Sequence, residues 1–412
     1  MSERTAARPS YDAIVDLYPG DSIRRAAYGL VKFTFEPRGG RARLVEAEPL
    51  HHDIRDPDAE PRIVPGTDFW PFKGRTDVVV QGSAYAPQRR PTRRMEVSVS
   101  LGDRLMKRIA VFGDRRVSWE SSGRVRFGLP EPFEEMPVTW EQAFGGCDFR
   151  VPLPEPLTDG LKIQLHHDHP GLYPRNPFGR GYAVLPDPVE DFFLPNLEDP
   201  DDLLADGRLI TGDPRLWYTR PIPWTFDWMH PVAFPRFLYM GLGADAWFPG
   251  PQDRRMPEVA RGWLRDHYRD DFERNPPVLD PMQPFMQGAS HGMTVADPAP
   301  GLPIRIRGMH PDLPEVVMPL PDQSPWIELL LDGRPLPTRI RMHHVVCRPG
   351  DMRYTIVYGA EASLPRGFIP GVHGRIPLAV RVGEDPPLEY QAPPTMKSLL
   401  ETAPPTSEPA DG

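Results

Sequence analysis

Three phrases between Gly74 and Gly146 decide the fold: GRTDVVVQGSAYAP (residues 74–87), RIAVFGDRRVSWE (108–120) and EPFEEMPVTWEQAFGG (131–146). The first and second have the composition of strands that end in turns. The third carries two prolines, a tryptophan and a closing Gly-Gly pair, which predicts a loop. These phrases predict a chain of short strands joined by shaped loops.

Alternating apolar residues on both sides of these phrases predict further strands. Val31, Phe33 and Phe35 share one face of a strand over 28–36, and Gly39-Gly40 turns it into a hairpin with 41–47. Gly102-Asp103 joins 95–101 to 105–112 in a second hairpin. Other strands are expected at 77–84, 115–120, 124–127, 326–331, 339–346, 353–358 and 378–382.

Proline is the unusual feature of the composition. The chain of 412 residues contains 56 prolines, about 14%, where roughly 5% is usual. Each proline removes a backbone donor and is excluded from helix interiors, so strands, turns and long loops are favoured. We expect a mainly β fold, an antiparallel sandwich or barrel-like core with long proline-rich loops and few short helices. The best helix candidate is 256–272.

The length allows one large or two moderate domains. We expect an N-terminal arm at 1–22, a β-rich domain with long loop insertions at 23–320, and a C-terminal β subdomain packed on it at 321–390. The tail at 391–412 is rich in Pro, Thr, Ser and Glu, which predicts disorder.

Charge and cysteine usage exclude several classes of function. The net charge is −9, and the basic residues are scattered, which argues against nucleic-acid binding. No segment has the length and apolarity of a signal peptide or membrane span, so we expect a cytoplasmic protein without a membrane partner. Two cysteines are too few for a disulfide framework.

The three phrases resemble the signature of the bacterial family called domain of unknown function 2169. The resemblance extends over about residues 23–320 in scattered blocks, including NPFGRG at 176–181 and LPNLEDP at 194–200. Members of that family accompany type VI secretion effectors as adaptors or loading chaperones. The resemblance implies a non-catalytic adaptor that binds a secreted effector, through its N-terminal region or a PAAR-type tip domain, and helps load it onto the VgrG spike. It implies no cofactor.

The candidate partner-binding or signature residues all lie in the three phrases. They are Asp77, Tyr85, Pro87, Asp114, Arg115, Trp119, Phe133, Trp140, Glu141, Phe144, Gly145 and Gly146. Two interpretations of the aromatic members stay open: they pack in the core at a sheet edge, or they form a partner-binding groove, since rigid aromatics dominate small interfaces. For Asp114-Arg115 we expect a structural turn with a local salt bridge.

Enzymatic alternatives depend on one cluster, His166, His167, Asp168 and His169, which could begin a metal site. Adjacent side chains on an extended chain point apart, and no later His-x-x-x-His completes the ligand set. No Gly-x-Ser-x-Gly elbow or phosphate-binding glycine loop occurs either. A metal-dependent hydrolase on a β core and a carbohydrate-binding sandwich therefore remain alternatives to the adaptor.

Overall fold

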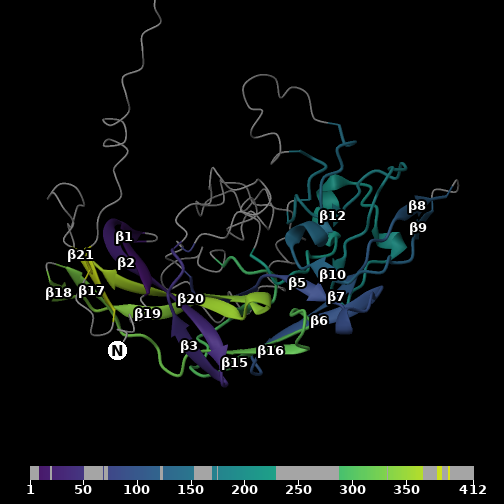
Figure 1. The fold of residues 1–412 in the computed structure, drawn as a ribbon. Helices are drawn as coiled ribbons and strands as arrows, with labels where there is room; N and C mark the ends of the chain where they lie inside the picture. Colours follow the sequence, from purple (N-terminus) through teal and green to yellow (C-terminus); the bar gives the residue numbers. More distant parts are fainter. Residues whose placement is uncertain are drawn as a thin grey trace, which may run out of the picture. The chain divides into compact units, whose positions relative to one another are not determined.

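The structure is a computed structural model that describes residues 9–18, 21–50, 68, 73–120, 124–152, 169–173, 175–228, 287–331, 333–364, 378–382 and 388–389 (Figure 1). The chain divides into two compact units. The larger unit contains Met1–Ser10, Val31–Ser324 and Arg341–Tyr358, and the smaller unit contains Tyr11–Leu30, Pro325–Ile340 and Gly359–Gly412.

The mainly β prediction is confirmed. Short strands in several sheets dominate the described residues, as the proline content requires. The described helical segments are 3₁₀ turns of three to six residues. They are η1 (Pro87–Arg89), η2 (Trp140–Gln142), η3 (Asp206–Arg208), η4 (Pro214–Thr219) and η8 (Pro349–Asp351). In this part of the chain, no helix has the length and apolarity needed to span a membrane.

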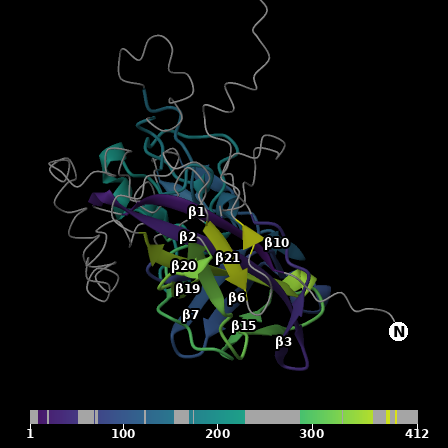
Figure 2. The same cartoon turned by 90° about the vertical axis from the view of Figure 1, so that its left-hand side faces the viewer.

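One sheet combines strands from both ends of the chain. Its order is β1 (Ser10–Tyr18), β2, β20, β19, β4 and β14, with β3 paired to β2. Figure 2 labels β1, β2, β3, β19 and β20 of this sheet. The bounds are β2 (Asp21–Arg38), β3 (Arg41–Val45), β4 (Thr76–Val80), β14 (Thr294–Val295), β19 (Arg339–Arg348) and β20 (Arg353–Ser363). β4 and β19 are parallel, which their long separation in sequence permits, because parallel strands need a long connection.

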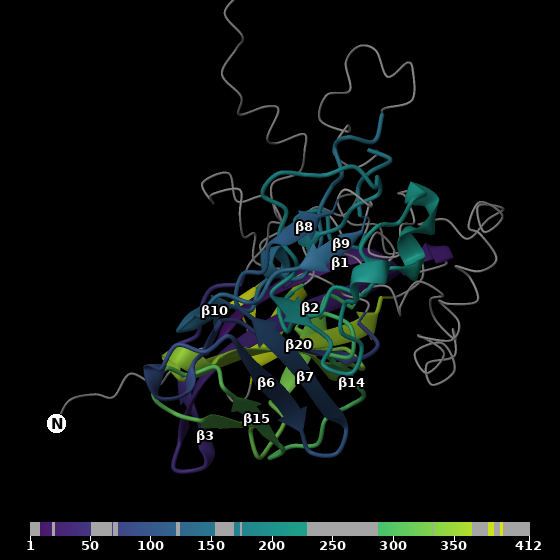
Figure 3. The same ribbon diagram turned by 90° about the vertical axis from the view of Figure 1, so that its right-hand side faces the viewer.

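The second large sheet has the order β13, β7, β6, β15 and β16, and every pair in it is antiparallel. Figure 3 labels its central strands β7, β6 and β15. The bounds are β6 (Arg94–Leu101), β7 (Leu105–Phe112), β13 (Leu197–Glu198), β15 (Pro303–Arg307) and β16 (Glu315–Pro319). β6 and β7 form the hairpin predicted around Gly102, and β2 and β3 form the one predicted around Gly39.

Short strand pairs complete the larger unit. β5 (Ser83–Tyr85) pairs with β10 (Glu135–Pro137), and β8 (Val117–Trp119) with β9 (Val125–Phe127). β11 (Phe144–Gly145) lies parallel to β12 (Arg180–Gly181). The smaller unit contains the four-stranded sheet of β18 (Arg334–Pro335), β17 (Ile327–Leu331), β21 (Leu378–Val382) and β22 (Leu388–Glu389).

Three expectations differ from the observed elements. The strand expected over 77–84 is two strands, β4 and β5, because Gly82 between them has a φ of +142° and redirects the chain. The expected arm at 1–22 contains β1 (Ser10–Tyr18), which pairs with β2, and the start of β2 itself. The helix expected at 256–272 lies outside the described residues.

The β6–β7 hairpin provides a test of which face of the sheet is buried. Ile109 is fully buried, whereas Met106 on the same strand is 63% exposed. We expect Ile109→Ala to lower the free energy of unfolding by about 2–5 kcal/mol, since it removes apolar contacts and leaves a cavity. Met106→Ala is the matched control and should change it by less than about 0.5 kcal/mol. Urea unfolding measures both; equal losses would contradict this assignment of faces.

Candidate functional site

Two places in the larger unit contain four of the twelve signature residues. One is a buried group of charged side chains around Asp77, which we call the Asp77 network: Lys32, Asp68, Lys73, Asp77 and His344. The other is an open cavity, which we call the glycine hollow. It is lined by Asp114, Gly145, Gly146, Cys147, Gly179, Arg180, Gly181, Tyr182, Val189, Asp191, Phe192 and Phe193.

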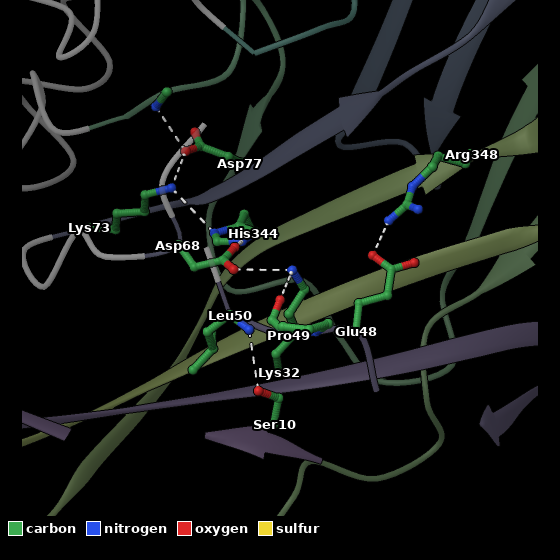
Figure 4. A network of polar contacts seen from close by, with 11 residues as sticks. Ser10, Lys32, Glu48, Pro49, Leu50, Asp68, Lys73, Asp77, His344 and Arg348 are labelled. Atoms are coloured by element: carbon green, nitrogen blue, oxygen red, sulfur yellow. Dashed lines mark hydrogen bonds and ion pairs between the residues drawn. The ribbon is translucent and has the colours of Figure 1, made fainter. Parts of the chain in front are cut away.

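The Asp77 network is a continuous chain of polar contacts (Figure 4). Lys73 Nζ lies 2.7 Å from Asp77 Oδ2 and 3.4 Å from His344 Nδ1. His344 Nε2 lies 2.9 Å from Asp68 Oδ1, and Lys32 Nζ donates to Asp68 Oδ2 at 3.1 Å. The network therefore connects β2, β4 and β19 with two intervening segments.

Neighbouring groups enclose this network. The Gly288 amide donates to Asp77 Oδ2 at 2.9 Å, and Lys32 Nζ also donates to the Pro49 carbonyl at 3.1 Å. The ring of Trp228 lies 4.7 Å from Lys73 Nζ and meets the His344 ring edge-on. Every member is almost fully buried, which places Asp77 away from any surface that a partner could reach.

Burial keeps the histidine of the network neutral. Burial, then the positive charge of Lys73, lowers the pKa of His344 to about 4. The adjacent His343 is also buried, and its pKa is lowered well below the ordinary value for the same reason. A neutral His344 accepts a hydrogen bond from Lys73 at Nδ1 and donates from Nε2 to Asp68. These two contacts connect β19 to the segments that carry Lys73 and Asp68.

The buried pair between Lys73 and Asp77 should therefore be essential for stability. We expect Asp77→Asn to lower the free energy of unfolding by about 3–5 kcal/mol, because it leaves the Lys73 ammonium buried without its counter-charge. The exposed pair of Arg89 and Asp312 is the control, and Asp312→Asn should cost less than about 1 kcal/mol. If both substitutions lowered the free energy of unfolding equally in urea, burial of the ion pair would not determine how much stability its loss removes.

The pKa of His344 predicts how stability depends on pH. An unfolded histidine has a pKa of about 6.5, whereas folded His344 has a pKa of about 4. Between these two pH values the unfolded chain binds a proton at this residue and the folded chain does not. Stability should fall as the pH drops through this range, by up to about 1.4 kcal/mol per pH unit from this residue. Urea unfolding between these pH values measures the slope. It should be shallower in His344→Gln, and an unchanged slope would assign the pH dependence to other groups.

The glycine hollow has a volume of about 380 Å³ and is built by two signature loops that meet at β11 and β12. Their close approach requires glycine. A Cβ at Gly145 would lie 2.1 Å from the Asn176 carbonyl oxygen, and one at Gly179 would lie 2.5 Å from the Ala143 carbonyl oxygen. Asn176 fastens the loops further by donating to the carbonyls of Trp140 and Phe144. The two phrases AFGG and NPFGRG thus make one structure.

Asp114 and Arg115 have separate partners. Asp114 lies 3.1 Å from Arg180 Nη1 at the hollow and accepts a hydrogen bond from Asn196 at 3.0 Å. Arg115 points inward to Glu198 and the Pro195 carbonyl, with its guanidinium 4.1 Å from the Phe112 ring centroid. The expected local salt bridge does not form, because successive side chains on extended backbone point in opposite directions.

The signature aromatics divide by burial. Phe133, Trp140 and Phe144 are buried, as in the core-packing interpretation, and Phe144 stacks edge-on against Tyr173 and Tyr182. Trp119 and Tyr85 are half-buried.

Trp119 meets the Phe192 ring edge-on at 5.6 Å, which places it directly behind the hollow. Burial, then Glu135, raises the pKa of Tyr85. Of the other signature residues, Pro87 is exposed and Glu141 is half-buried.

Of the histidine cluster at 166–169, only His169 lies within the described residues. Its Nδ1 accepts from the Gly171 amide at 3.0 Å and lies 3.5 Å from Cys147 Sγ. Burial, then the negative charge of Asp148, raises the pKa of the Cys147 thiol to about 11. Among the described side chains, no group of three His, Cys, Asp or Glu residues could hold a metal ion.

The rate at which the Cys147 thiol is alkylated reports on the environment of the hollow. Because the thiolate is the reactive form, its alkylation by iodoacetamide should keep accelerating above pH 9, where an ordinary cysteine of pKa about 8.5 levels off. Cys347 is fully buried, so Cys147→Ser should abolish labelling of the folded protein. Mass spectrometry measures the rates. A plateau near pH 9 would contradict the raised pKa.

Several residues at these two places carry no obvious signal in the sequence. Lys73 precedes Asp77 by four residues, but Asp68 and His344 join it only through folding. Arg180, Asn176 and Asn196 belong to the phrases NPFGRG and LPNLEDP, whose turn-rich composition predicted loop shape without assigning roles to single residues. The Asn196 side chain donates to Asp114 and to the Phe112 carbonyl, both in the second phrase. Its backbone amide donates to the Gln142 carbonyl in the third phrase at 2.8 Å, so Asn196 joins these two phrases.

Comparison with known proteins gives one family. A family model described as "Uncharacterized protein conserved in bacteria (DUF2169)" matches residues 24–359. No curated protein and no solved structure was found to match the chain.

Proposed function

We propose, since the chain belongs to the DUF2169 family, that it is a cytoplasmic, non-catalytic adaptor that binds a type VI secretion effector and assists its loading onto the VgrG spike. The partner is the effector itself, through its N-terminal region or a PAAR-type domain. The adaptor needs no cofactor, and neither nucleic acid nor membrane takes part. The proposal extends the resemblance of the three signature phrases to members that accompany such effectors.

The observation that carries this proposal is the convergence of signature residues on one open surface. Asp114, Gly145 and Gly146 come from the second and third phrases, and Arg180 and Gly181 come from NPFGRG; all line the glycine hollow. The hollow does hold one nucleophilic side chain, Cys147, with His169 Nδ1 3.5 Å from its sulfur, but burial raises the pKa of this thiol to about 11 and so disfavours the thiolate that a nucleophile needs. A cavity of backbone, aromatic rings and paired charges is instead suited to holding another chain.

The surroundings of the hollow also favour protein binding. Phe149 is 69% exposed and Phe178 is 45% exposed, each on one of the two loops that build the hollow. Exposed aromatic side chains on ordered loops supply contact area at a low entropic cost on binding. An adaptor that uses no nucleotide has this static complementarity as its mechanism: it covers an effector surface until the spike accepts it.

The test is an affinity pull-down of the tagged protein from its native lysate, followed by mass spectrometry. We expect recovery of a protein that contains a PAAR or VgrG domain together with a toxin domain. A double variant, Phe149→Ser with Phe178→Ser, should reduce this recovery, whereas Met106→Ser, an exposed apolar residue on β7, should not. Recovery of general chaperones alone, at equal levels from every variant, would reject the adaptor proposal.

A further inference from the structure

We infer that the glycine hollow binds an extended segment of the partner that carries lysine or arginine side chains between small residues. The inference deepens the proposed function and rests on it for the identity of the partner. It names the place on this chain and the chemistry of what is bound. The binding chemistry itself follows from the shape, charge and packing of the hollow.

The shape of the hollow selects a narrow occupant. Gly145, Gly146, Gly179 and Gly181 belong to its lining and add no side chain to the cavity. A volume of about 380 Å³ is at the lower end of the range for ligand pockets, so it fits a few residues of extended chain and not the width of a helix. Small residues of the occupant facing the half-buried Gly146 and Gly179 would bring the two backbones together.

One wall of the hollow is apolar and held in place by its neighbours. Val189, Phe192 and Phe193 form this wall. The Trp119 ring meets Phe192 edge-on, and the Arg116 guanidinium lies 5.0 Å from the centroid of the Phe193 ring. A wall that is already ordered suits the aliphatic stem of a lysine or arginine, which packs along apolar surface while its charged head stays in water.

Carboxylates dominate the charge around this wall. The segment LPDPVEDFF at 185–193 carries Asp187, Glu190 and Asp191 and no basic residue, and its three acidic residues are exposed. Asp191 is paired with Arg116, and Asp114 with Arg180. The nearby Arg150 is engaged by Asp148 through two contacts of 2.7 Å.

The charge balance therefore favours a cation. The arginines at the hollow are already paired, while Glu190 and Asp187 add negative charge that none of these arginine side chains neutralises. A basic segment would gain from this field, whereas an acidic segment or a free anion would be repelled. A glycan would use the aromatic wall but would gain nothing from the carboxylates, so a basic peptide fits the combined features best.

The experiment uses the full chain and two synthetic probes. The first is a fluorescein-labelled dodecapeptide of alternating glycine and arginine, and the second is its glycine and glutamate counterpart. Fluorescence anisotropy should show saturable binding of the basic peptide that weakens with added salt, and no binding of the acidic one. Binding of both peptides, or of neither, would overturn the inference.

Two variants test whether the hollow is the binding place. Val189→Trp fills the cavity from its half-buried rim, and Glu190→Gln with Asp191→Asn removes two carboxylates without changing side-chain size. Each variant should lower the affinity for the basic peptide about tenfold. Asp201→Asn with Asp202→Asn removes two exposed carboxylates outside the hollow and is the matched control, expected to change affinity less than about twofold. If all three variants bound the basic peptide with equal affinity, binding would depend on the general negative charge of the protein and not on the hollow.

Cys147 supplies an independent readout, because it lines the hollow and the other cysteine is fully buried. Saturating basic peptide should slow alkylation of Cys147 in the native protein and leave it unchanged in Val189→Trp. Protection that persists in Val189→Trp would overturn the inference.

Failure of this inference can be told from failure of the proposed function. If an effector or spike protein is recovered equally by native protein and Val189→Trp, the adaptor role stands and the hollow is not its docking site. If the basic peptide binds at the hollow but no secretion component is ever recovered, the binding chemistry stands and the secretion role fails.

Discussion

The ion pair between Lys73 and Asp77 is the interaction on which the first sheet depends. Both side chains are completely buried, so each charge is tolerated only because the other lies 2.7 Å away. Asp77 is held by β4, and its carboxylate also accepts the Gly288 amide, which fixes a segment more than two hundred residues later in the chain. Through His344 and Asp68 the same contacts reach β19 and β2. The network thus specifies which distant segments meet, a role for which an apolar cluster would be less selective.

The Asp77 network and the glycine hollow differ in solvent exposure and in the elements that they hold together. The Asp77 network is closed to solvent and keeps strands from both ends of the chain in register. The glycine hollow is open, and its loops are held by the Asn176 and Asn196 amides and by glycines at points of backbone contact. Prolines restrict the remaining loop backbone, so these loops have shape without helices. Under the proposed function, such an ordered surface would bind its partner by complementarity, without an energy source.

Local pattern predicted the parts of the fold that local forces decide. Both hairpins were placed correctly because alternating burial and a two-glycine or Gly-Asp turn act within about 20 residues. Two of the expected strands differ from the observed ones in where they end. Gly82 divides one expected strand between two sheets, and β20 continues to Ser363, beyond the expected end at residue 358. Of the candidate site, the sequence analysis singled out Asp114, Gly145 and Gly146, but it could not separate these residues of the cavity lining from Phe133, Trp140 and Phe144, which pack in the core.

The sequence by itself determined the fold class, the hairpins and the membership of a family, since proline content, period-two alternation and motif spacing are properties of neighbouring residues. Only the tertiary structure decided the partners of the charged residues. Asp68 and His344, and Asp114 and Arg180, are separated by 276 and 66 positions. Nothing in their local surroundings favours one partner over another. Pairing over such distances is chosen by burial, which penalises every unpaired charge, and burial exists only after the sheets have assembled.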